Sequence, residues 1–183
     1  MLTKVKIAIL IIGYLLTISC NESSKQHTNI QKDTTDPASI PTHEIWDFSM
    51  AFTDSNRTRA ILKSKKAKVF EARNETLLDS GVYVQFMNPY SKPAGFMTSQ
   101  RARIDEKTRD MFANGNVYVQ SDSTHTTLNT QSLMWKEESR QLYTKDRIHI
   151  VTPTEIIDGI GLESDIWLKN YKIFQVSGTK IIE

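Results

Sequence analysis

The stretch ARIDEKTRDMFANGNVYV, residues 102–119, and the stretch LMWKEESRQLYTKDRIHI, residues 133–150, follow one pattern. In each stretch an apolar segment ends in a charged run, Asp105 to Asp110 or Lys136 to Gln141, and alternating apolar residues follow. Alternation with a period of two is typical of a half-buried strand. Each stretch therefore predicts a strand, a solvated turn and a returning strand.

This strand–turn–strand unit is repeated along the chain. The tetrapeptide Val-Tyr-Val-Gln occurs at 82–85 and again at 117–120, and a further, slightly shorter offset aligns Arg109 with Arg140. Units of roughly 31 to 35 residues are thus repeated at least three times, a period typical of repeated structural units. Other aligned pairs are Ala67 with Ala102, Val69 with Ile104, Gly81 with Asn116, Ile104 with Trp135, and Val117 with Ile148.

The repeats predict an all-β fold, because no window along the chain has a convincing helical stripe. Antiparallel strand units of this length form a sandwich, a propeller or an open curled sheet. A propeller is excluded, since roughly 140 residues supply only about three blades. We therefore predict an open, twisted antiparallel sheet that folds over its own apolar face. Within it, we expect Asn114-Gly115 to form a bulge or bend.

Composition indicates one ordinary domain: 183 residues, 39% hydrophobic and 24% charged, with a formal net charge of +2. This charge balance gives no electrostatic reason to expect a nucleic-acid partner.

The N-terminal segment predicts a cleaved signal peptide over residues 1–19. Lys4 and Lys6 precede a short apolar run, and Cys20 is the only cysteine in the chain. The segment resembles a bacterial lipobox, although Thr17 stands where a leucine is usual, and the resemblance implies lipidation of Cys20. The alternative is an uncleaved anchor, but the short apolar run falls well below the roughly 20 residues needed to span a bilayer.

Residues 20–42 are expected to form a flexible tether, because Ile30 is the only aliphatic residue between Asn21 and Ile40. The domain is then expected over residues 43–183.

Several motifs in the second half of the chain resemble the OstA-like β-jellyroll domain, and the chain from about 40 to 183 resembles the LptC family of lipopolysaccharide-export proteins. The matching features are the Asn-Gly-Asn-Val-Tyr-Val strand at 114–119, the residues Leu128, Thr130, Leu133 and Trp135, the pair Gly159 and Gly161, and the segment from Tyr171 to Gly178.

The resemblance implies a jellyroll whose apolar groove binds the acyl chains of lipopolysaccharide. In this family the groove receives lipopolysaccharide from the inner-membrane ABC transporter and passes it, through a sheet edge, to an LptA-like jellyroll protein. It also implies a periplasmic, non-enzymatic protein without a cofactor, held at the inner membrane here by the lipid on Cys20. Many members begin with a transmembrane helix; this sequence departs from that pattern.

Strand parity gives the candidate groove positions, for each of which ordinary core packing is an equally good interpretation. Gly159 and Gly161 are expected in a turn. His27, His43, His125 and His149 lack metal-ligand spacing, so we predict no metal site. The predicted groove residues are Trp46, Phe48, Val69, Val84, Phe86, Val117, Val119, Trp135, Ile148 and Ile150.

Two other functions remain open at this point. A structural or protein-binding lipoprotein would use the sheet edges for β-augmentation without carrying glycolipid. An enzyme, for example a polysaccharide hydrolase, would need converging catalytic groups, and Asp105 and Glu106 are better explained as turn residues. The basic cluster Lys63, Lys65, Lys66 and Lys68 is interpreted as a solvated edge, with contact to lipopolysaccharide phosphates as the alternative.

Overall fold

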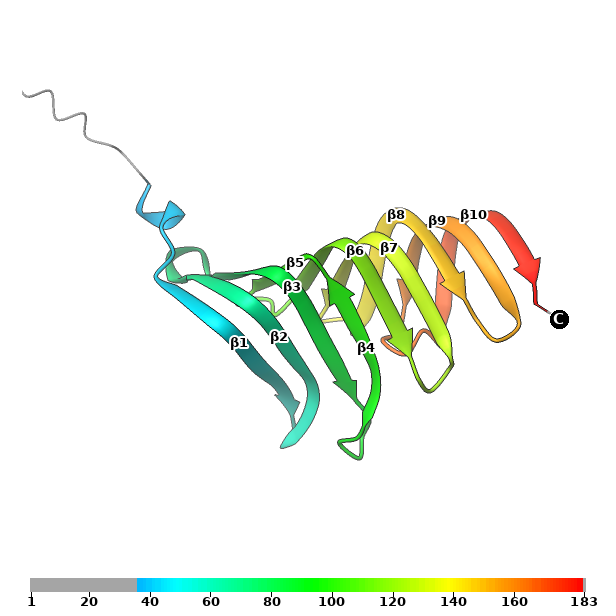
Figure 1. Ribbon diagram of the computed structural model, residues 1–183, viewed down its shortest axis with the longest axis horizontal. Helices are drawn as coiled ribbons and strands as arrows, with labels where there is room; N and C mark the ends of the chain where they lie inside the picture. Colours follow the sequence, from blue (N-terminus) through cyan, green and yellow to red (C-terminus); the bar gives the residue numbers. More distant parts are fainter. Residues whose placement is uncertain (1–35, 183) are drawn as a thin grey trace, which may run out of the picture. The chain divides into compact units, whose positions relative to one another are not determined.

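The structure, a computed structural model, describes residues 36–182, which form one antiparallel sheet of ten strands (Figure 1). The predicted signal peptide, Cys20 and the predicted tether as far as residue 35 lie outside the described residues. A short 3-10 helix, Pro37–Ser39, precedes the sheet. The strands are β1 (His43–Asp54), β2 (Arg57–Phe70), β3 (Glu75–Met87), β4 (Pro93–Ser99), β5 (Arg101–Asp105), β6 (Met111–Ser121), β7 (Thr126–Lys136), β8 (Gln141–Val151), β9 (Glu155–Ser164) and β10 (Tyr171–Ile181).

The strands follow one another across the sheet in chain order, from β1 at one edge to β10 at the other (Figure 1). Strands β4 and β5 act as one strand interrupted at Gln100, because both pair with β3 and with β6. The N–H of Gln100 donates to Gly115 O at 2.9 Å, and its carbonyl accepts the N–H of Gly81 at 3.0 Å. The hydrogen-bond ladder therefore continues through the interruption.

A row of bulges crosses the sheet near the middle of the strands. The pairing register shifts between Ser64 and Lys66 in β2, between Asn114 and Val117 in β6, and between Thr144 and Arg147 in β8. The backbone there reaches positive φ, 96° at Gly81 and 85° at Gly115. A bulge bends its strand and increases the local twist. Bulges at this level on several strands therefore fold the sheet over one face, and the predicted break at Asn114-Gly115 is confirmed.

The sequence repeat corresponds to a repeated turn. Asn74, Arg109 and Arg140 lie in the turns that join β2 to β3, β5 to β6 and β7 to β8, and their φ angles are 52°, 63° and 54°. The repeat offsets carry Asn74 onto Arg109 and Arg109 onto Arg140, so the three left-handed residues occupy equivalent positions. The predicted strand–turn–strand units are thus confirmed, with charged turns at 106–110 and 137–140.

The inner face of the folded sheet forms the hydrophobic core. Leu62, Leu128, Ile150 and Leu162 have no exposed surface, and they come from strands at both ends of the sheet. No buried side-chain nitrogen or oxygen among the described residues lacks a hydrogen-bond partner. Strands β1 and β10 each pair on one side only, so the core is bounded by two free edges.

The expectation that Gly159 and Gly161 occupy a turn is wrong, because both lie within β9. A Cβ on Gly159 would lie 2.7 Å from the carbonyl oxygen of Gln175 in the neighbouring strand. Gly161 has φ +75°, and a Cβ there would lie 2.5 Å from the ring of Phe174. These glycines therefore permit the close approach of β10 to β9.

Candidate functional site

A pocket of about 460 Å³ opens from the inner face of the sheet. Its walls come from the hairpin joining β1 to β2, from the middle of the sheet, and from the turns following β5, β7 and β9. These segments are distant in the sequence, and they meet because the sheet folds over its inner face. The pocket is therefore a property of the whole jellyroll.

The floor of the pocket is apolar. Val84 and Phe86 of β3, Met97 of β4, and Leu133 and Trp135 of β7 line it. Apolar side chains of this kind bind hydrocarbon through removal of area from water, at about 25 cal/mol per Å². Methionine also adapts its shape to irregular ligands. The floor can accept an acyl chain, but it offers little that would distinguish one chain from another.

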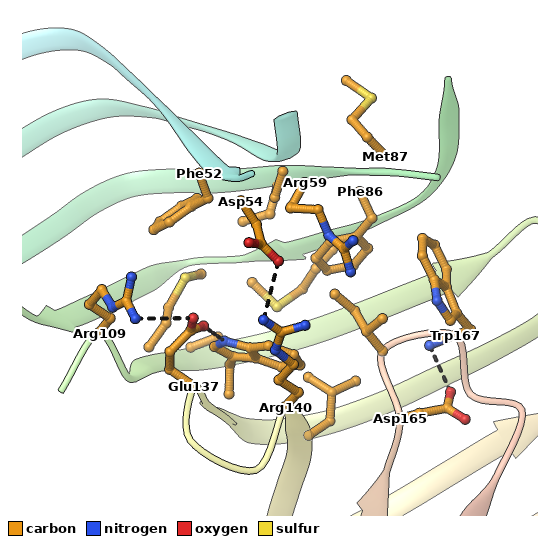
Figure 2. A pocket seen from close by; sticks show the side chains of 18 of the residues that line it. Phe52, Asp54, Arg59, Phe86, Met87, Arg109, Glu137, Arg140, Asp165 and Trp167 are labelled. Atoms are coloured by element: carbon orange, nitrogen blue, oxygen red, sulfur yellow. Dashed lines mark hydrogen bonds and ion pairs between the residues drawn. The ribbon is translucent and has the colours of Figure 1, made fainter. Parts of the chain in front are cut away.

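The rim of the pocket is charged, with arginines from three separate elements (Figure 2). Arg59 belongs to β2, Arg109 to the turn after β5, and Arg140 to the turn after β7. Arg109 lies 3.6 Å from Glu137, and Arg140 lies 3.2 Å from Asp54. An apolar floor beneath a charged rim suits a molecule with a hydrocarbon part and a polar part.

The Asp54–Arg140 ion pair crosses the mouth of the pocket (Figure 2). It joins the end of β1 to the turn after β7, 86 residues further along the chain. The Ser55 hydroxyl, followed by the guanidinium of Arg140, holds the pKa of Asp54 below its usual value. Nearby, the Thr124 hydroxyl donates to Trp167 O at 2.9 Å and also links separate turns. Side-chain contacts therefore bridge the mouth between segments that share no backbone hydrogen-bond ladder.

A second set of contacts fixes the Trp135 end of the pocket. The indole N–H of Trp135 donates to Glu137 Oε2 at 3.0 Å, and the backbone N–H of Glu137 donates to Asp110 Oδ1 at 3.0 Å. These bonds connect the turn after β7 with the turn after β5. Trp135 consequently presents its ring to the pocket from a supported position.

Most of the predicted groove residues lie on the inner face. Phe48 and Trp135 are half-buried against the core, and Val69 is half-buried. Val84, Phe86 and Trp135 also line the pocket, whereas Val119 and Ile150 are fully enclosed. Contact of any of them with lipid remains a prediction. The buried members of the predicted set are Val84, Phe86, Val117, Val119, Ile148 and Ile150.

Trp46 is the exception, and its predicted inward position is wrong: 63% of its surface is exposed. Asp47 has φ 51°, which breaks the alternation of β1 between Trp46 and Phe48. The Trp46 ring lies beside Lys66, whose Nζ is 5.0 Å from the ring centroid. Lys66 in turn pairs with Glu44 at 2.9 Å, so this part of the lysine cluster is a solvated edge away from the pocket lining.

The acidic turn residues are structural. Asp105 Oδ1 accepts the N–H groups of Lys107 and Thr108 at 2.9 and 3.1 Å, and the Thr108 N–H is the main cause of a lowered pKa for Asp105. Glu106 Oε1 accepts the Thr76 hydroxyl at 2.6 Å. Between residues 36 and 182, no group of three His, Cys, Asp or Glu side chains is placed to hold a metal ion. No helix in that range is long and apolar enough to cross a membrane.

The charged rim of the pocket was not predicted from the sequence. Its only signal was the repeat, which aligned Arg109 with Arg140 and so placed two arginines at equivalent turns. Arg59 and Asp54 reach the same rim only through the folding of the sheet. The floor residues missed by the parity argument are Met97, Met111, Leu133, Leu142 and Trp167.

Comparison with known proteins agrees with this architecture. A crystal structure of LptH from Pseudomonas aeruginosa, described as the LptA-homologous periplasmic component of the conserved lipopolysaccharide transport device, matches with a TM-score of 0.51 and 10% sequence identity. The match covers 68% of this chain and 94% of that chain, and it shows the fold, an LptA-like antiparallel jellyroll. No curated protein matches the sequence. The profile described as "Lipopolysaccharide-assembly, LptC-related" matches residues 6–179, nearly the whole chain, and the protein therefore belongs to this family.

Proposed function

We propose that this protein binds the acyl chains of lipopolysaccharide in the apolar groove of its jellyroll. It receives them from the inner-membrane ABC transporter and passes them to the next jellyroll protein of a bridge. The observation that carries this proposal is the pocket of about 460 Å³, with its apolar floor, charged rim and position between two free sheet edges. Membership of a lipopolysaccharide-assembly family supports the choice of ligand.

The chemistry of the floor suits transfer. Contacts such as those offered by Phe86 and Met97 are apolar and non-directional, so their total grows with the area covered. Neighbouring positions along such a surface differ little in energy, and an acyl chain can move between them without a large barrier. The driving force then comes from the transporter, because the protein acts as a passive carrier without enzymatic activity.

The free edges suit assembly into a bridge. Strand β10 pairs only with β9, and Phe174 and Val176 on β10 are 44% and 59% exposed. An unpaired edge accepts another strand by β-augmentation. Addition of a like jellyroll at this edge would extend both the sheet and the groove, whereas β1 provides the opposite edge for the transporter.

We place the domain in the periplasm, held at the inner membrane by acyl chains on Cys20 and a tether that ends near residue 42. A domain anchored in this way stays close to the transporter while its sheet edges remain free to pair. Each buried methylene of the anchor contributes about 0.8 kcal/mol to membrane attachment.

Photo-crosslinking in cells tests the proposal. A benzoylphenylalanine at Phe86 or Trp135, which line the pocket, is expected to capture lipopolysaccharide. The same probe at Tyr83 or Tyr118, aromatic residues outside the pocket lining, is the matched control and is expected to capture none. Equal capture at both sets of positions contradicts the groove. Capture of protein alone, with no glycolipid at any position, favours a protein-binding lipoprotein.

A further inference from the structure

We propose that Arg59, Arg109 and Arg140 form a phosphate subsite at the mouth of the pocket, which binds the phosphorylated headgroup of an amphiphile whose acyl chains occupy the floor. The proposal rests on the proposed function and assigns the part of the ligand that stays outside the apolar groove. All three residues line the same pocket, and they come from three different elements of the fold (Figure 2).

The arginines lie where the headgroup of a bound amphiphile would meet water. The floor beneath them is lined by Phe86, Leu133 and other apolar residues. An amphiphile that places its acyl chains on this floor must leave its headgroup at the rim, because a buried charge without a partner is costly. The headgroup would then meet guanidinium groups, whose planar donors match phosphate oxygens in pairs.

The present partners of these arginines are exchangeable. The Arg109–Glu137 and Arg140–Asp54 distances are 3.6 and 3.2 Å, and the arginine side chains are 71% and 60% exposed. Ion pairs this open to water contribute little to stability. Arg59 is exposed and forms no ion pair within residues 36–182.

The rim carboxylates keep other partners when the arginines turn to a ligand. Asp54 Oδ1 accepts the Ser55 hydroxyl at 3.1 Å, and Glu137 Oε2 accepts the Trp135 indole N–H at 3.0 Å. A third rim acid, Asp165, already accepts the backbone N–H groups of its own loop. An anionic headgroup therefore replaces the Asp54 carboxylate as the partner of Arg140. This replacement also breaks the Asp54–Arg140 ion pair that crosses the mouth of the pocket.

Calorimetric titration of the full chain tests the subsite with two ligands, diphosphorylated lipid A and the same lipid after removal of its phosphates. Arg140→Gln and Arg59→Gln are each expected to weaken binding of the phosphorylated lipid about tenfold and to leave the dephosphorylated lipid unaffected. Arg101→Gln makes the same charge change at an exposed position of β5 outside the pocket, and it is expected to change neither affinity.

Asp54→Asn separates a binding role from a structural one. It breaks the same ion pair as Arg140→Gln but keeps the guanidinium, so it is expected to strengthen binding of the phosphorylated lipid. If Asp54→Asn and Arg140→Gln weaken both lipids alike, the pair acts only as a structural clasp and the subsite is overturned.

Millimolar inorganic phosphate is added as a competitor in a further titration. The proposal expects no displacement of the phosphorylated lipid, because the acyl chains supply much of its affinity. Full displacement would assign the arginines to free phosphate and overturn the headgroup subsite. If both lipids bind wild type and variants equally, the subsite fails while the groove stands; if neither lipid binds at all, the proposed function itself fails.

Discussion

Replacement of Gly161 by alanine tests how closely β10 is held against β9. Gly161 has φ +75°, a left-handed conformation that an L-residue adopts at a cost of roughly 1–2 kcal/mol. The new methyl group would also lie 2.5 Å from Cδ2 of Phe174, so the ring or the strand must move. Overpacking of this kind costs about 1–3 kcal/mol. The two contributions together predict a loss of about 2–5 kcal/mol in the free energy of unfolding.

Urea denaturation followed by circular dichroism measures this loss. Gly178→Ala on β10 is the matched control, because no atom lies within 4 Å of its added Cβ and its φ is not in the left-handed region. We expect the control to change stability by less than about 0.5 kcal/mol. A second comparison, Gly161→Ala in a Phe174→Ala background, should recover the steric part of the loss. Equal stability of Gly161→Ala and Gly178→Ala would refute the close approach of the two strands.

Three further predictions concern the hydrophobic core, the Asp54–Arg140 ion pair and the exposed Trp46. Leu128→Ala, at a fully buried position, should cost about 2–5 kcal/mol in urea denaturation, and a loss below about 1 kcal/mol would contradict an enclosed core. The pKa of Asp54 is lower in the folded state than its unfolded-state value near 3.8, so the ionised carboxylate stabilises the folded state when the pH is above 3.8. This stabilisation is lost as the pH falls through the folded-state pKa. Acid titration should therefore destabilise wild type slightly more than Asp54→Asn, and parallel curves would contradict stabilisation of the ionised carboxylate by Ser55 and Arg140. Trp46→Ala should lower the free energy of unfolding by less than about 1 kcal/mol, and Trp135→Ala by about 3 kcal/mol, in thermal or urea unfolding. A larger loss for Trp46→Ala than for Trp135→Ala would indicate that Trp46 points inward after all.

Much of the fold could be predicted from the sequence because apolar and polar residues alternate along most of each strand and the turns repeat. The repeat offsets located Arg109 and Arg140 in equivalent turns, and their shared left-handed backbone explains why the two turns match. Parity also placed Val84 and Ile150 on the inner face. Strand alternation and turn conformation are local properties, so a repeated sequence pattern predicts them directly.

The remaining features depend on geometry that the pattern does not record. A single left-handed residue, Asp47, reverses the side on which Trp46 points, and an aspartate within a strand gives no clear signal of such a break. The glycines of β9 looked like turn residues because close strand approach and a turn both favour glycine. The rim was missed because Asp54 and Arg140 meet only after the whole sheet has folded over.

The tryptophans of the protein offer the most direct test of the apolar groove. The chain has three, of which Trp135 and Trp167 line the pocket and Trp46 lies outside it. Three variants, each keeping one tryptophan and replacing the others by phenylalanine, can be titrated with lipid A that carries brominated acyl chains, a short-range quencher of indole fluorescence. We predict strong quenching of Trp135 and Trp167 and little quenching of Trp46. Equal quenching of all three, or quenching of Trp46 alone, would contradict binding of acyl chains in the groove.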